Sequence, residues 1–137
     1  MVQTLTIIRG LPGSGKSTMA KKLLAVSPPT AVWAEADHYF TDANGVYTFN
    51  AAQLGAAHGE CYDLVEQALC DGHCAIVSNT FTTLREMRPY FELALRHGIR
   101  PDVVTCYDNF GSIRGVPEDV VDRMRTRFQH DFTSLYQ

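Results

Sequence analysis

The residues from Gly10 to Thr18 carry the clearest chemical signature in the chain. They read Gly-Leu-Pro-Gly-Ser-Gly-Lys-Ser-Thr and contain the pattern Gly-x-x-x-x-Gly-Lys-Ser. A polyphosphate has to be wrapped by backbone N–H groups, and glycine lets the main chain approach it closely. In this pattern Lys16 reaches the β- and γ-phosphates, and the Ser17 hydroxyl reaches Mg²⁺. The residues predicted to bind a nucleoside triphosphate are Gly10, Leu11, Pro12, Gly13, Ser14, Gly15, Lys16, Ser17 and Thr18.

The residues on either side of this stretch support the prediction. Residues 5–8 form a short apolar run typical of a strand, and Met19, Ala20, Leu23 and Leu24 recur at helical spacing. A strand, a loop and a helix therefore follow in the order that a phosphate-binding loop requires. The alternative is a glycine-rich turn that precedes a helix without binding a ligand.

Asp37 is the candidate general base. It follows a predicted second strand over residues 31–36. In an open parallel sheet, ligands bind beyond the carboxyl ends of the strands. Asp37 is therefore expected to lie near the phosphates held by the first loop, where its carboxylate can deprotonate an acceptor hydroxyl.

Two further strands are predicted over residues 74–78 and 102–108. The first ends in Asn79-Thr80 and carries no acid, whereas the second ends at Asp108. The second ligand of a magnesium ion beside Ser17 is therefore either Asp37 or Asp108. Strands that alternate with helices indicate an α/β fold, with a parallel sheet of about four to five strands flanked by helices.

A helix capped by Asn50 is predicted to run to about residue 71. Its apolar stripe consists of Leu54, His58, Cys61, Val65 and Leu69. His58 lies at the centre of this stripe, so it is either a core residue or a substrate contact.

The segment after the third strand carries two arginines that are candidate substrate contacts. Arg85 and Arg88 follow Thr80 closely, and together these residues either bind an anionic acceptor or are solvated surface groups. Pro89 lacks a backbone N–H, so we expect it to divide this segment into a short turn and a longer helix.

Residues 109–128 are expected to form a lid that closes on the site. The segment begins as a loop that contains Arg114 and continues as a helix. A guanidinium brought in by closure stabilises the charge of a transferring phosphoryl group, and Arg114 is the candidate for this role. The helix carries further arginines, which either share this role or pair with acids on the same helix face: Arg123, Arg125 and Arg127.

Size and charge limit the possible functions. The 137 residues fit a single domain, and a net charge of −3 provides no bulk basicity for holding long nucleic acid nonspecifically. No apolar run is long enough to span a membrane, so we expect a cytoplasmic location and four reduced cysteines. Cys70-x-x-His73-Cys74 has the spacing of metal ligands, but structural zinc usually takes two paired ligand sets. The sequence carries no signal of oligomeric state.

As an ordered set, the motifs resemble those of small P-loop kinases related to polynucleotide 5′-hydroxyl kinase, with zeta-toxin-type kinases as more distant relatives. They span nearly the whole chain and comprise Gly10–Thr18, Asp37–Phe40, Ala57-His58 with Cys61, Ser78–Thr80, Pro89-Tyr90 and Gly115–Pro117. The resemblance implies ATP with Mg²⁺ and transfer of the γ-phosphate to a hydroxyl. It also implies that Asp37 orients and deprotonates the acceptor, and that Arg114 lies near the lid arginine of the family.

The chain departs from this family at two places. Relatives usually carry an aspartate in the stretch occupied here by Ser78-Asn79. They also carry an Arg-Asn pair shortly before the Gly-Val-Pro, where this chain has Gly111-Ser112.

The favoured hypothesis is an ATP-dependent kinase that acts on a hydroxyl of a nucleic acid or nucleotide. Phage-encoded members of this broad group phosphorylate hydroxymethyl groups on pyrimidine bases in DNA, and we keep that substrate as a candidate. A base taken out of a duplex stacks on aromatic side chains. The candidates are Tyr39, Phe40, Tyr47 and Phe81, and the alternative is that these aromatics only close the core. The alternatives are a regulatory P-loop NTPase or nucleotide-binding module without an acceptor, and a small-molecule kinase.

Overall fold

The computed structural model describes residues 2–111 and 115–137. Four strands alternate with helices along the chain, and short 3₁₀ turns lie between some of them. The elements are β1 (Leu5–Gly10), α1 (Lys16–Ala25), β2 (Val32–Ala34), η1 (Ala36–Phe40), η2 (Ala51–Gln53), α2 (Leu54–Cys70), β3 (Ala75–Ser78), α3 (Leu84–Arg96), β4 (Asp102–Cys106), α4 (Glu118–Arg127) and η3 (Thr133–Tyr136).

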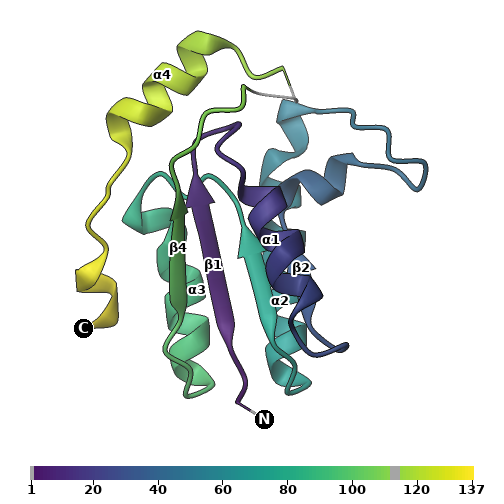
Figure 1. The fold of residues 1–137 in the computed structure, drawn as a ribbon, viewed down its shortest axis with the longest axis vertical. Coiled ribbons are helices and arrows are strands. Elements are labelled where there is room, and N and C mark those ends of the chain that lie inside the picture. The colour runs from purple at the N-terminus through teal and green to yellow at the C-terminus, as the bar shows by residue number, and fades with distance from the viewer. Residues whose placement is uncertain (1, 112–114) are drawn as a thin grey trace.

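The strands form one parallel sheet in the order β2-β3-β1-β4. At its centre Ile7 of β1 lies in register with Val77 of β3 and with Val103 of β4. This arrangement confirms the predicted α/β class and falls within the predicted range of strand number. All four strands end at the same edge of the sheet, which is the upper edge in Figure 1.

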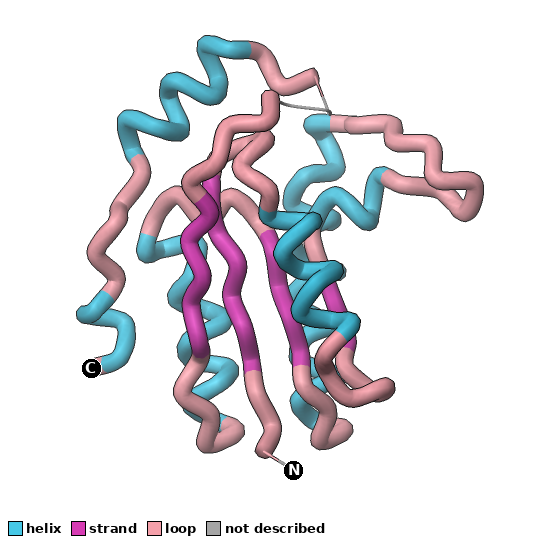
Figure 2. The backbone as a smooth tube through the Cα atoms, viewed as in Figure 1, coloured by secondary structure: helices cyan, strands magenta, loops and turns pink. Residues whose placement is uncertain are grey.

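Helices cover both faces of the sheet, as the colouring of Figure 2 makes clear. On one face, Ala20 of α1 packs against Ile8 and Ile76. On the other face, α2 and α3 pack over Leu5, Ile7 and neighbouring apolar residues. Alternate residues of each strand point to opposite faces, so continuously apolar strands such as β3 fit a sheet that is buried on both sides.

The second strand is shorter than predicted. It ends at Ala34, and Asp37 lies within the η1 turn instead of directly after a strand that runs to residue 36. The backbone leaves the sheet here because the Ala36 N–H donates to the side chain of Asn79 at 2.8 Å, and the His38 N–H donates to the Glu35 carbonyl at 3.1 Å.

The prediction that Pro89 divides the α3 segment is wrong. A single helix runs from Leu84 to Arg96 with Pro89 inside it. The proline lies near the N-terminus, where it removes one intrahelical hydrogen bond, and burial of the apolar face outweighs this loss. The buried residues of that face are Met87, Tyr90, Phe91, Leu93 and Ala94.

The expected place of His58 in an apolar stripe is also wrong. The buried residues of α2 are Ala57, Cys61, Val65, Ala68 and Leu69, whereas Leu54 and His58 are exposed. The Asn50 side chain caps the short η2 turn by accepting from the Ala52 N–H, and α2 begins after that turn. The predicted stripe is therefore buried from Cys61 onward, and Ala57 takes the buried place expected for His58.

Among residues 2–111 and 115–137, no helix combines the length and apolar character needed to cross a bilayer.

Arg9 ties β1 to the loop after β3 and to the C-terminal segment. This fully buried side chain donates from Nε and Nη2 to the Phe81 carbonyl, at 3.0 and 2.7 Å. Its guanidinium also lies 4.1 Å from the ring centroid of Phe128. Phe81 has a φ of 46°, in the left-handed region that bulky residues rarely adopt. The two hydrogen bonds from Arg9 help to hold this conformation.

We predict that Arg9→Ala lowers the free energy of unfolding by about 2–4 kcal/mol, because the buried Phe81 carbonyl loses a charged donor and the Phe128 ring loses its packing partner. Chemical denaturation measures this change. Arg88→Ala is the matched control, since Arg88 is exposed and its removal is expected to change stability by less than about 0.5 kcal/mol. Equal effects of the two substitutions would contradict the role given to Arg9.

Candidate functional site

The predicted phosphate-binding loop connects β1 to α1 at the carboxyl edge of the sheet (Figure 1). Its conformation depends on glycine at two places. A Cβ on Gly10 would collide with the Ser14 hydroxyl and lie 2.7 Å from the Cys106 carbonyl oxygen. Gly15 has a φ of 93° immediately before α1. The loop therefore has the close backbone packing and the left-handed turn that a phosphate cradle requires.

Lys16 and Ser17 begin α1, so their side chains lie at the end of the helix that carries partial positive charge. The Lys16 ammonium donates to the Leu11 carbonyl at 2.9 Å, and this contact holds the lysine across the loop. The Ser17 hydroxyl lies 3.1 Å from a carboxylate oxygen of Glu35. A curled loop, a lysine and a hydroxyl beside a carboxylate are the groups expected for a triphosphate with a magnesium ion.

Glu35 is a buried carboxylate that the sequence analysis did not identify. It follows β2, and its Oε2 atom accepts from the Ser78 hydroxyl at 2.8 Å as well as from Ser17. The Ser78 oxygen in turn accepts from the Trp33 indole N–H at 2.9 Å. A glutamate within an apolar run was the only sequence signal, because its partners come from distant segments.

Asp37 lies on the same edge of the sheet as the loop, two residues after Glu35. Its Oδ1 atom accepts a hydrogen bond of 3.2 Å from the Tyr47 hydroxyl. Asn79 holds the start of this turn, since its amide oxygen accepts from the Ala36 N–H and its amide nitrogen donates to the Cys61 thiol at 3.6 Å. The turn that carries the candidate base is therefore held by Asn79, which follows β3 and also contacts α2.

Of the other predicted site residues in the described part of the chain, Thr80 borders the phosphate loop and the rest are exposed. The Thr80 carbonyl accepts from the Gly10 N–H at 3.2 Å, so Thr80 borders the loop. Arg85 and Arg88 lie exposed in the first turns of α3, and His58 lies exposed near the start of α2. Asp108 is exposed beyond β4. Arg114 lies outside the described residues, so its predicted lid role stays a prediction.

Two arginines of α4 pair with acids of the same helix. Arg123 contacts Asp119 at 3.1 Å, and Arg125 contacts Asp122 at 2.6 Å. This pairing is the alternative that the sequence left open for them. Arg127 instead donates to the Thr82 hydroxyl at 3.1 Å.

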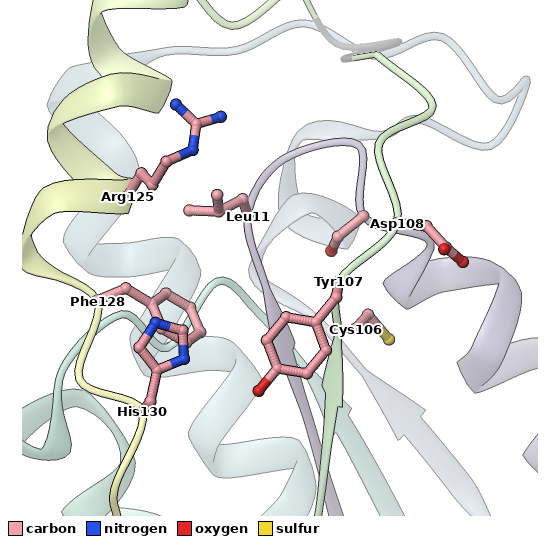
Figure 3. Close-up of a pocket in the computed structure, with 8 residues that line it drawn as sticks. Leu11, Cys106, Tyr107, Asp108, Arg125, Phe128 and His130 are labelled. Carbon is pink, nitrogen blue, oxygen red and sulfur yellow. The ribbon is translucent and has the colours of Figure 1, made fainter.

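Two hollows lie beside the loop. The larger has a volume of about 360 Å³ and lies between the start of α1 and the end of β4, where it is lined in part by Thr18, Lys22, Thr105 and Phe110. The smaller, of about 80 Å³, lies between Leu11 of the loop, Tyr107 after β4 and Phe128 after α4 (Figure 3). Ligand pockets measure about 300–1,000 Å³, so only the larger hollow has the size of a nucleoside site.

The four aromatic residues suggested as base-stacking partners divide into two groups. Phe40 and Phe81 are buried and belong to the core, so they are wrong as stacking candidates. Phe40 packs against Ala36 and Ala57, and Phe81 packs edge-on against Tyr90. Tyr39 is exposed and Tyr47 is half-buried, so both stay accessible from solvent.

Comparison with known proteins identifies relatives of this arrangement. A family model described as "AAA domain" matches residues 5–108. The chain is 34% identical over 135 residues to human NEDD4-binding protein 2, a match that covers 91% of this chain and 8% of that protein. The chain thus corresponds to a small part of this relative.

Solved structures share the fold at low sequence identity. Chaetomium thermophilum Kti12 in complex with ADP-AlF3 gives a TM-score of 0.68 at 16% identity, covering 91% of this chain and 80% of that one. A chain of the Pnkp1/Rnl/Hen1 RNA repair complex gives 0.58 at 21% identity, covering 94% and 39%. Other structures with this fold include an APS kinase and a gluconokinase. The resemblance to P-loop kinases is therefore confirmed at the level of the fold.

We predict that Asn79→Ala lowers the free energy of unfolding by about 1–3 kcal/mol, because the buried Ala36 N–H loses its acceptor. Urea denaturation provides the measurement. Asn44→Ala removes the same amide group from an exposed turn and serves as the control, with an expected change below about 0.5 kcal/mol. If both variants were as stable as the wild type, the hydrogen bond of Asn79 would not stabilise the turn that carries Asp37.

Proposed function

The chain belongs to the AAA domain family and has the fold of P-loop kinases, and from this premise we propose that it transfers the γ-phosphate of ATP to a hydroxyl group. The observation that carries the proposal is the position of Asp37. It lies on the same edge of the sheet as the phosphate loop, within two residues of a carboxylate that contacts Ser17. A loop for the donor and a nearby base for the acceptor are the two parts that phosphoryl transfer needs.

The loop residues bind and neutralise the donor in this proposal. Lys16 exchanges its contact with the Leu11 carbonyl for the phosphate oxygens, and the N-terminus of α1 adds its partial positive charge. The Ser17 hydroxyl would hold Mg²⁺, which would screen phosphate charge when bound. The hollow of about 360 Å³ beside Thr18 and Phe110 has room for the nucleoside.

Asp37 orients the acceptor and accepts its proton. The hydrogen bond from the Tyr47 hydroxyl holds the carboxylate, and an acceptor hydroxyl would donate its hydrogen to this carboxylate. The contacts of Asn79 keep this turn in place, so the carboxylate is positioned before the substrate arrives.

The acceptor we propose is a nucleic acid or a nucleotide. The resemblance of the motifs to polynucleotide 5′-hydroxyl kinases supports this choice, and hydroxymethyl pyrimidine in DNA belongs to the same substrate class. Arg85 and Arg88 lie in the first turns of α3, after the strand that ends beside the loop, where they could contact an acceptor phosphate.

A second candidate function is ATP hydrolysis without an acceptor, and Ser78 favours it because the end of β3 carries no acid. ATP labelled at the γ-phosphate, incubated with oligonucleotides, nucleosides, hydroxymethylated DNA and small-molecule alcohols, separates the candidates. Label in one of the nucleic-acid products supports the proposal, and label in a small-molecule alcohol identifies a small-molecule kinase. Label in free phosphate alone identifies an NTPase. Lys16→Ala provides the inactive reference.

We predict that Asp37→Asn lowers kcat about 10²–10⁴-fold and leaves ATP affinity nearly unchanged, because it removes the base and keeps the shape of the side chain. Steady-state kinetics and calorimetric ATP titration measure the two effects. Asp63→Asn, at an exposed acid of α2, is the matched control, and Asp108→Asn tests the rival acid beyond β4. A large loss of activity in Asp108→Asn with normal activity in Asp37→Asn would reverse the assignment.

Labelling of Cys106 tests, without any acceptor, whether ATP binds in the hollow of about 360 Å³. Burial raises the pKa of the Cys106 thiol, against the opposing charge of Lys16. The thiolate is therefore scarce at neutral pH, and alkylation should accelerate only toward higher pH than for an ordinary thiol. We predict that ATP slows maleimide labelling of Cys106, which lines the hollow, and leaves the exposed Cys70 unaffected. Peptide mass mapping measures both rates, and equal protection of the two thiols would contradict this location of the nucleotide.

A further inference from the structure

Glu35 and Ser78 face the same side of the sheet as α1. Trp33 and Ile76 belong to the apolar cluster beneath this helix. Side chains two residues apart in extended backbone lie on the same face, and Glu35 has extended φ and ψ angles of −147° and 152°. The carboxylate therefore lies at the carboxyl end of β2, below the start of α1.

The hydrogen bonds around Glu35 form a chain of defined direction. The Trp33 indole N–H donates to the Ser78 oxygen, so the Ser78 hydroxyl hydrogen is directed to Glu35 Oε2. The Ser17 hydroxyl donates to the same carboxylate oxygen. The second oxygen, Oε1, lies 3.5 Å from His38 Nε2. The carboxylate does not cap η1, although it occupies the cap position.

This direction matters for the Ser17 oxygen. A hydroxyl has one hydrogen to donate and two lone pairs to share. Because the hydrogen points to Glu35, the lone pairs point away from the carboxylate and can bind a cation. Glu35 thus both orients the hydroxyl and adds negative charge beside it.

We propose that Glu35 is the carboxylate of the magnesium site and that it is supplied from β2 because the end of β3 carries Ser78. The inference rests on the proposed function, since it requires ATP with Mg²⁺ in the phosphate loop. In P-loop NTPases the ion is held by the loop hydroxyl and a carboxylate. Here the carboxylate that contacts the loop hydroxyl comes from the strand one position further from β1.

The length of the Glu35 side chain fits a carboxylate that is attached at the end of β2 and not of β3. Neighbouring strands lie about 4.8 Å apart, so an acid on β2 has farther to reach toward α1 than an acid on β3. Glutamate has one methylene group more than aspartate, and Ser78 bridges part of the remaining distance through its hydroxyl.

The two acids considered from the sequence fit this role less well. Asp37 engages the Tyr47 hydroxyl, and Asp108 is exposed beyond β4 beside the nucleoside hollow. Glu35 is the buried acid and it contacts Ser17 directly.

Equilibrium binding of a fluorescent ATP analogue, with Mg²⁺ and with EDTA, tests the proposal without an acceptor. The wild type is expected to bind the analogue more tightly with Mg²⁺. Glu35→Gln should lose about 10–100-fold of affinity in Mg²⁺ and none in EDTA, because the amide keeps the shape but not the charge. Adding Ser78→Asp to Glu35→Gln should restore the effect of Mg²⁺ by returning a carboxylate to β3. Glu60→Gln, an exposed acid of α2, should match the wild type.

Three outcomes of these titrations would overturn the inference. An unchanged effect of Mg²⁺ in Glu35→Gln would show that another group holds the ion. Equal weakening in Mg²⁺ and EDTA would show that Glu35 shapes the loop instead. A wild type whose affinity for the analogue does not depend on Mg²⁺ would exclude the magnesium site.

A separate outcome distinguishes this inference from the proposed function. A wild type that binds the analogue more tightly with Mg²⁺ but phosphorylates no acceptor would refute the proposed transfer and leave the role of Glu35 supported by the binding data.

Discussion

The parallel alignment of the four strands places every polar group of the site at one edge of the sheet. In a parallel sheet the loops that follow the strands all emerge on the same side, and these loops carry the chemistry. Here the loop after β1 leads into α1, which begins with Lys16 and Ser17. The segment after β2 provides Glu35 and Asp37, and the one after β3 provides Asn79. An antiparallel pairing of any central strand would send one of these groups to the opposite edge.

Several contacts at this edge stabilise the fold and organise the site at once. Gly10 packs against the Cys106 carbonyl, which fixes the loop to the end of β4. Asn79 joins the Asp37 turn to Cys61 of α2, and the buried Glu35 joins β2 to β3 and α1. Buried polar groups lose hydration, so each stabilises the edge only while its partners are present. Substitutions in this layer therefore change positioning and stability together.

The sequence predicted what depends on local pattern. Neighbouring residues are enough to predict the motif of the phosphate-binding loop, the alternation of strands and helices, and the position of Asp37 after β2. The errors arose where tertiary contacts decide. Burial of one face carries α3 through Pro89, and in the first turns of α2 the sheet and neighbouring segments bury Ala57 and leave His58 exposed. Glu35 could not be recognised because its partner Ser17 lies 18 positions earlier in the sequence.

The distribution of arginine charge bears on which acceptors the site suits. The guanidinium groups of Arg123 and Arg125 lie beside carboxylates on the exposed face of α4, so a polyanion meets a nearly neutral surface there. Arg85 and Arg88 instead lie near the N-terminus of α3, where positive side chains oppose the helix dipole and an anion relieves that conflict. Binding along the length of a nucleic acid needs several phosphate contacts. If Arg85 and Arg88 take part in the proposed transfer, they suit an acceptor that presents one or a few phosphates.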